Sequence, residues 1–513
     1  MVSLKTLENV LYKLKKEEIK SLINFIEYNQ KEEKSVKLRS VQLIKALLSG
    51  AKYSTLELQI LLYGKANYST FNKLVNRLKD KVYEVLLFDN SLNNSKNYSI
   101  RNRTIFDIKK RLLQSEIMYL RGMNTELVNY HNKIIATAKK YEIYDSLIEA
   151  LQAKQRYLGF RLGSSTYLKL KEEISFYEKN RNSLNRTIDI YNNIASKINF
   201  SSSRAEYASE LESVLQVLKN EFETTGSPSI GYYYFLLLID YYQGINDYKL
   251  AGETLIRFKI LIESNVSVKT KLRYGNVLIN IANNELLMFN FENCSLYATE
   301  SYKYFEDSVI NTNIAKEFEF YAFYYQSNFH LSEIQITELY NSSRSFNTPF
   351  LFSKRAYMLA CLKTLGREFK KSEELLFEVS EIEKDKEGWN IGKRVLTILN
   401  KIEMGEFESV DLQVQNLQRH IKRTLKTKQV RKRNILILRV LLKLINEQFD
   451  FQKVYQSRQR YFNLLVSNDP DYRWAIKSPE LIIFHEWFLS KVEGRSYNHS
   501  AAILKEKNKN FPC

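Results

Sequence analysis

The chain has 513 residues, 44% hydrophobic and 26% charged, which is enough apolar content for a packed interior and excludes a disordered chain. Only 15 residues are glycine and 5 are proline, and because these two residues usually end helices, their scarcity predicts an almost wholly α-helical protein. Three well-separated cysteines argue against a disulfide framework and a cysteine zinc site, while the net charge of +19 favours an acidic partner.

Residues 1–90 predict a small helical N-terminal domain. Ser54 and Glu57 have the spacing of a capping box, in which each side chain binds the other residue's backbone amide at the start of a helix. A long amphipathic helix is predicted from Thr70 to Phe88. Together with a helix at Val36–Leu48, these elements resemble the helix-turn-helix core of winged-helix activators that carry helical-repeat tails. That resemblance implies four residues that face a DNA groove: Asn72, Lys73, Asn76 and Arg77.

A three-helix cap that closes the apolar end of a helical array explains the same N-terminal pattern, and we favour this interpretation. The polar stretch Asn90–Ser99 predicts the boundary of the domain. Residues 100–200 then predict helical hairpins. Turns or loops are predicted at Arg121–Met123, Gly163–Ser165, Ser201–Ser203 and Thr224–Pro228.

From about residue 230 onward, one short phrase recurs six times. It is an aromatic residue followed three positions later by a small residue or, in the last two copies, a valine. The intervals between successive aromatic residues are 43, 38, 40, 38 and 44 residues, and a period near 40 is typical of stacked helix pairs. The six pairs are Tyr248 with Ala251, Phe291 with Cys294, Phe329 with Ser332, Phe369 with Ser372, Phe407 with Val410, and Phe451 with Val454.

The phrases at Tyr248, Phe369 and Phe407 resemble the start of the second helix of a tetratricopeptide repeat. This resemblance covers about residues 230–460 and implies an all-α solenoid of tetratricopeptide-like helical hairpins. The aromatic ring would wedge between the two helices of a pair, and the small residue would let the next helix approach. Because the period exceeds the family's 34 residues, we expect longer helices. The expected order is the N-terminal domain at 1–90, helical hairpins at 100–200, the repeat array at 205–460, and a C-terminal helical cap and tail at 461–513.

No motif for catalysis or cofactor binding stands out. The sequence contains no GxxxxGK[ST] or GxGxxG loop for phosphate, no GxSxG nucleophile turn and no HExxH zinc motif. Its five histidines are scattered, without the spacing of metal ligands. We therefore expect no catalytic, cofactor-binding or metal-binding residues, no cofactor, and a protein that is not an enzyme.

A basic segment in the C-terminal third is a second candidate surface. No acidic residue occurs from Gln415 to Asn446, and eight cations fall within 15 residues of this stretch. Such a run attracts phosphates or acidic protein faces. A solvated helix end is the alternative, because lysine and arginine favour the last turn of a helix. The eight residues are Arg419, Lys422, Arg423, Lys426, Lys428, Arg431, Lys432 and Arg433.

Together these features predict a cytoplasmic, non-enzymatic scaffold or adaptor that binds another protein on the curved face of the array. No apolar run approaches the roughly 18 residues that a membrane helix needs, so no membrane partner is expected. The sequence also allows a homo-oligomer, since a stretch with net charge −7 (201–350) lies between basic ends (+15 for 1–200 and +11 for 351–513). The alternative function is a nucleic-acid-binding transcriptional regulator, with an N-terminal helix-turn-helix and repeats that sense a signal.

Overall fold

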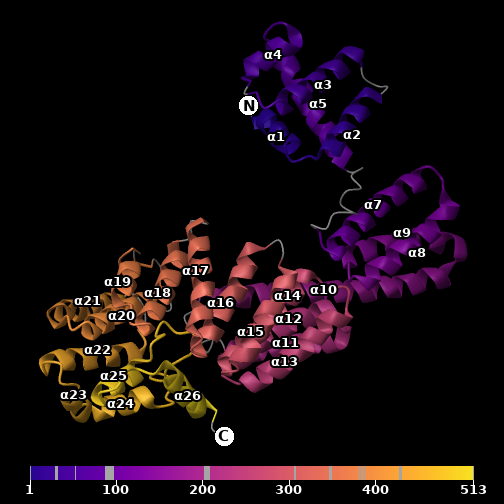
Figure 1. Ribbon diagram of the computed structural model, residues 1–513. Coiled ribbons are helices and arrows are strands. Elements are labelled where there is room, and N and C mark those ends of the chain that lie inside the picture. The colour runs from indigo at the N-terminus through magenta and orange to yellow at the C-terminus, as the bar shows by residue number, and fades with distance from the viewer. Residues whose placement is uncertain are drawn as a thin grey trace. The chain divides into compact units, whose positions relative to one another are not determined.

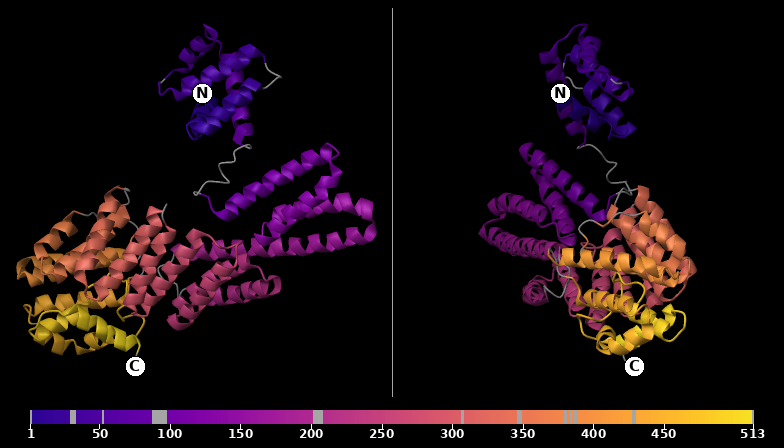
Figure 2. Two further views of the ribbon diagram at one scale, coloured as in Figure 1. Left: turned by 45° about the vertical axis from the view of Figure 1, so that its right-hand side comes forward. Right: turned by 90° about the vertical axis from the view of Figure 1, so that its left-hand side faces the viewer.

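The regular structure of the chain is helical throughout the part that the structure describes, with no strand there (Figures 1 and 2). The chain divides into two compact units, residues 1–139 with 146–167 and residues 140–145 with 168–513. Residues 90–97 of the predicted boundary and the predicted loop at 201–203 lie outside the described residues. The computed structural model describes residues 2–28, 33–51, 53–86, 98–200, 208–305, 308–345, 349–378, 381–382, 385, 388–426 and 430–511.

Five helices at the N-terminus close around a core of their own, in which Leu7, Phe71 and Leu78 are fully buried. The predicted capping box is present: the Glu57 amide donates to Ser54 Oγ (3.2 Å), and the Ser54 amide donates to Glu57 Oε2 (2.7 Å). The helices are α1 (Val2–Leu11), α2 (Lys16–Tyr28), α3 (Lys34–Leu48), α4 (Thr55–Tyr63) and α5 (Tyr68–Leu86).

Longer helices follow, and two of the predicted turns fall between them. Gly122 and Gly163 both have positive φ (71° and 86°), a conformation that glycine adopts without steric cost. Gly163 directly follows a helix, and Gly122 is the second residue after one. The helices are α7 (Ile100–Leu120), α8 (Asn124–Lys140), α9 (Tyr144–Leu162), α10 (Ser164–Phe200) and α11 (Ala208–Thr225).

Twelve further helices form six consecutive pairs, and each helix packs against the next one along the chain. This arrangement confirms the predicted all-α fold of tetratricopeptide-like helix pairs. The pairs are α12 (Pro228–Gly244) with α13 (Tyr248–Ser264), α14 (Lys271–Leu287) with α15 (Phe291–Ser301), α16 (Val309–Tyr325) with α17 (Phe329–Ser345), α18 (Pro349–Leu365) with α19 (Phe369–Phe377), α20 (Trp389–Glu403) with α21 (Phe407–Leu425), and α22 (Lys432–Asn446) with α23 (Phe451–Ser457).

The recurring sequence phrase marks the start of every second helix. Each of the six aromatic residues is the first residue of its helix, and the residue three positions later is buried in every case. A side chain that is small there leaves room for the neighbouring helix. Ser372 also accepts a hydrogen bond from Asn400 Nδ2 of the next pair (2.9 Å).

The turn between the two helices of a pair has the same geometry in the first five pairs. A residue with positive φ follows the first helix, and the next amide bonds back to the carbonyl five residues earlier, as in the Schellman motif. This bond satisfies a carbonyl that the helix end would otherwise leave unpaired. The positive-φ residues are Asn246, Phe289, Ser327, Arg367 and Gly405.

The C-terminal part completes the second unit. Helix α24 (Gln459–Val466) packs against α22 and α23, α25 (Phe484–Val492) packs against α23 and α24, and α26 (His499–Asn510) contacts α16. Residues 467–483, between α24 and α25, form no helix. This non-helical stretch is the most informative part of the second unit for function.

Candidate functional site

Residues 472–483, which we call the inner segment, lie against the first helices of successive pairs. Tyr324 of α16 donates its hydroxyl hydrogen bond to the Leu481 carbonyl (3.0 Å), and Tyr357 of α18 donates to the Pro479 carbonyl. A Cβ atom on Gly392 of α20 would lie 2.6 Å from that same Pro479 oxygen. The first helices therefore hold a non-helical stretch of turns and bends, largely through its main-chain carbonyls.

Side chains of the inner segment add further contacts with the same helices. The Lys477 amide donates to the Tyr325 hydroxyl (3.1 Å), and Lys477 Nζ donates to Asn283 Oδ1 of α14 (2.9 Å). The ring of Trp474 is 2% exposed and packs against Phe289 and Tyr325, while its Nε1 donates to the Glu480 carbonyl (2.8 Å). The segment is thus part of the core of the array.

Arg433 anchors this region to α22 with all five of its donors. Its Nε and one Nη contact both carboxylate oxygens of Glu480 (2.6 and 2.7 Å), a two-point geometry that arginine suits well. The other Nη donates to the carbonyls of Leu465 and Tyr472 (2.8 and 2.6 Å). Burial alone would raise the pKa of Glu480, but the Arg433 charge and hydrogen bonds hold it below its usual value.

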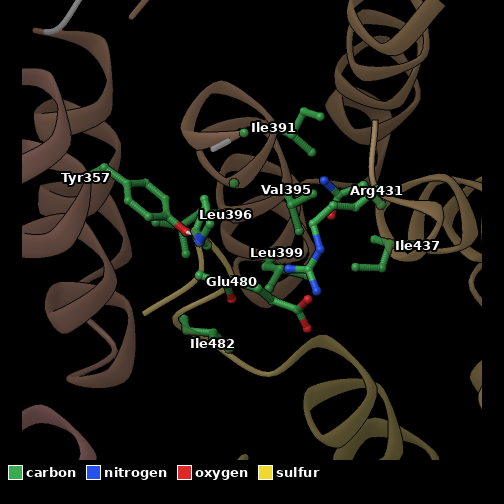
Figure 3. Close-up of a pocket in the computed structure, with 14 residues that line it drawn as sticks. Tyr357, Ile391, Val395, Leu396, Leu399, Arg431, Ile437, Glu480 and Ile482 are labelled. Atoms are coloured by element: carbon green, nitrogen blue, oxygen red, sulfur yellow. Dashed lines mark hydrogen bonds between the residues drawn. The ribbon is translucent and has the colours of Figure 1, made fainter. Parts of the chain in front are cut away.

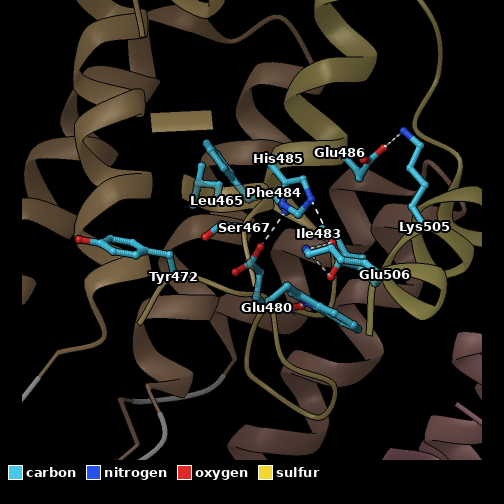
Figure 4. Close-up of polar contacts among 12 residues, drawn as sticks. Leu465, Ser467, Tyr472, Glu480, Ile483, Phe484, His485, Glu486, Lys505 and Glu506 are labelled. Carbon is cyan, nitrogen blue, oxygen red and sulfur yellow. Dashed lines mark hydrogen bonds and ion pairs between the residues drawn. The ribbon is translucent and has the colours of Figure 1, made fainter. Parts of the chain in front are cut away.

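His485 extends this polar cluster to α26 and lies between Glu480 and Glu506 (Figure 4). An Arg433 Nη lies 3.0 Å from His485 Nδ1, and because arginine can only donate, Nδ1 must accept. The proton of the neutral ring therefore sits on Nε2, which faces Glu506 Oε1 at 3.3 Å. Burial lowers the pKa of His485, which favours this neutral form.

A small cavity of about 30 Å³ remains beside the inner segment, enclosed by α18, α20 and α22. Figure 3 shows Arg431 and Glu480 pointing toward each other across it, with the apolar side chain of Leu399 beside them. An Nη of Arg431 donates to the Arg473 carbonyl (3.1 Å). A volume of this size holds roughly one water molecule, so this cavity is not a ligand site.

The basic segment divides into an inward and an outward part. Arg433 is fully buried and bound to Glu480, so the prediction that it meets an anionic partner is wrong. Arg431 is half-buried in the small cavity, and Lys432 pairs with Asp471 at the surface. Four residues are exposed along one face of α21, and Lys428 lies outside the described residues. The four are Arg419, Lys422, Arg423 and Lys426.

The four residues that a helix-turn-helix would turn toward DNA lie in the first half of α5. Lys73, Asn76 and Arg77 are exposed, and Asn72 is half-buried. Helix α4 packs chiefly against α3, whereas α5 packs chiefly against α1 and α2. DNA binding by this face stays a prediction.

A row of exposed apolar side chains marks the opposite surface of the array. Each of the five second helices from α13 to α21 carries such a residue that is at least half exposed, and α13 carries a second one, Ile260, which is not counted in the row. Three of these residues are sixth in their helix and two are ninth, one turn further along the same helix face. This outer row consists of Ile256, Leu296, Ile334, Phe377 and Leu412.

Sequence reasoning missed both the inner segment and the outer row. The signals for the former are modest: Pro470 and Pro479 exclude a long helix, and an apolar run at 481–484 follows them. The signal for the row is a leucine or isoleucine five positions after Phe291, Phe329 and Phe407.

Comparisons with known proteins give fold-level similarity only. No protein-family model and no curated protein matches the chain. Among solved structures, the chain is similar to the apo form of RapI, with 14% identity, coverage of 76% of this chain and 95% of that one, and a TM-score of 0.45. It is also similar to a signal transduction ATPase with numerous domains and a tetratricopeptide repeat sensor, from Pyrococcus horikoshii. That match has 14% identity, covers 81% of this chain and 64% of that chain, and has a TM-score of 0.40.

The described residues form neither a metal-binding group nor a membrane-spanning helix. No group of three or more His, Cys, Asp or Glu side chains within them could hold a metal ion. None of the helices in the described ranges is long and apolar enough to cross a membrane.

Proposed function

We propose that this protein is a non-enzymatic scaffold that binds another protein through the outward faces of its second helices. The observation that carries the proposal is the outer row. Single exposed apolar side chains are common on any protein, but one on each of five successive second helices, on the same helix face, forms a continuous pattern. Apolar side chains set among charged ones are typical of protein interfaces.

The inner side of the array is a poorer candidate, because the chain itself fills it. The inner segment contacts α14, α16, α18 and α20, and its Trp474, Leu481 and Ile482 are buried. Full burial of each such side chain contributes about 2 kcal/mol, so displacing the segment would use up much of the stability of a domain. The expectation of binding on the curved inner face is revised accordingly.

Site-specific photo-crosslinking tests this assignment. A photoreactive amino acid at position 296 or 334 should capture a protein in native cells, and the same group at Arg439, an exposed position on the first helix α22, should not. In the double variant Leu296→Lys, Leu412→Lys, capture from position 334 should fall at least tenfold, since each lysine removes apolar contact worth more than 1 kcal/mol.

Thermal unfolding of the double variant supplies the control, because exposed positions should tolerate lysine without loss of fold. Equal capture from positions 334 and 439, or capture that survives the two lysines, would refute the outer row as the binding surface.

A further inference from the structure

A cleft of about 370 Å³ lies between the α18–α19 turn, α20 and the C-terminal helix α25. It is separate from the outer row, and at roughly 30 Å³ per water molecule it has room for about a dozen waters. Its floor is apolar, formed by Leu365, Leu399 and Ile482. The rings of Phe369 and Trp487 also line it. This is the size and lining of a small-molecule site.

The polar groups of the cleft carry a net positive charge. Its one lining carboxylate, Glu403, is neutralised by Lys491 Nζ (2.7 Å) and also accepts from Trp487 Nε1 (2.7 Å). Arg367 and Arg495 add two more cations. Arg495 pairs with Glu493, whereas Arg367 contacts the Ser496 hydroxyl and has no carboxylate within 4 Å among the described residues.

The backbone at Arg367 adopts the turn geometry that recurs in five pairs of the array. Arg367 adopts φ 60°, a left-handed conformation that costs a residue with a Cβ roughly 1 kcal/mol or more. In the next pair along the chain, the equivalent turn position is a glycine, Gly405. In the pair that contains Arg367, the glycine is one residue earlier, at Gly366, and its φ is not positive. The same conformation occurs at Asn246, Phe289 and Ser327, so it belongs to the turn, and glycine would adopt it at position 367 without strain.

We propose that this cleft binds a small organic anion, a carboxylate with an apolar or aromatic body of about a dozen non-hydrogen atoms. The body lies on the apolar floor beside Phe369 and Trp487, and the carboxylate meets the guanidinium of Arg367. Because the walls come from both the array and α25, a bound ligand also ties the C-terminal helices to the array.

Calorimetric titration with 4-phenylbutyrate tests the site on the full-length chain. A ligand of this size with ordinary efficiency should bind with Kd of about 1 mM or tighter. The uncharged 4-phenylbutanamide should bind at least tenfold more weakly, because a hydrogen bond to a charged group contributes more than one to a neutral group. No heat of binding at 10 mM acid, or equal binding of acid and amide, overturns the proposal.

Arg367→Gly is the decisive variant. It removes the cation while it relieves the left-handed strain, so it should raise the unfolding temperature and weaken 4-phenylbutyrate at least fivefold. Arg460→Gln, an exposed arginine on α24, is the matched control and should bind as the parent does. Unchanged affinity in Arg367→Gly, or an equal loss in Arg460→Gln, contradicts the assigned role of Arg367.

Discussion

At the scale of single residues, the inner segment is held by buried polar groups, among which Arg433 uses all five of its donors. Arg433 is the clearest case, because removal of one partner from a buried ion pair costs about 3–5 kcal/mol. The sequence could not single it out. Arg433 and the exposed Lys432 are adjacent cations, and only the 100° rotation between neighbouring helix positions separates a buried anchor from a surface charge.

His499, the first residue of α26, gives a pH dependence at the same scale. Burial against Tyr324 and Tyr325 lowers its pKa to about 3, so the folded chain keeps the ring neutral where the unfolded chain protonates it below about pH 6.5. Its contribution to stability is therefore intact above pH 6.5 and falls by roughly 1 kcal/mol per pH unit between 6.5 and 3.

The variant His499→Phe keeps an aromatic ring that cannot titrate. The difference between its free energy of unfolding and that of the parent protein should depend on pH only below pH 6.5. Urea denaturation at pH 7.5, 6 and 5 measures it. A difference that stays constant over this range would show that His499 does not titrate on unfolding.

At the scale of elements, the sequence predicted what is local. The aromatic-x-x-small phrase places the start of each second helix, and the capping box at Ser54 and Glu57 is present, because these signals depend on residues within one helical turn. The inner segment could not be predicted in this way. Its path depends on partners such as Tyr324 and Tyr357, more than 120 residues away, and a stretch of turns and bends carries no periodicity.

At the scale of elements, two substitutions at equivalent positions of the repeated turn should change the free energy of unfolding in opposite directions. Ser327 adopts φ 60° and its hydroxyl is buried without a partner, so Ser327→Gly should stabilise by about 1 kcal/mol. Gly405 adopts φ 75° with open space around it, so Gly405→Ala should destabilise by about 1 kcal/mol through backbone strain alone. The midpoint of urea unfolding, compared at an unchanged denaturant slope (m-value), measures each change. Midpoint shifts of the same sign in the two variants would contradict the shared turn geometry.

At the scale of the second unit, the two sides of the array differ. The first helices hold the chain's own inner segment, and the second helices present the outer row to solvent. The inner side thereby contributes to stability, and the outer side is the proposed binding surface. The periodicity of the sequence predicts the array of helix pairs. Which side of the array stays exposed to solvent is known only from the path of residues 472–483 in the structure.

Hydrogen exchange of the full-length protein, read by mass spectrometry over residues 472–484, tests this assignment most directly. The amides of Lys477, Ile483 and Phe484 are bonded to Tyr325, Tyr497 and Glu480, so they should exchange as slowly as the amides of α16 and α18. Exchange at the rate of an unstructured peptide, with α16 and α18 still protected, would mean that the inner face is open and that a partner can bind there.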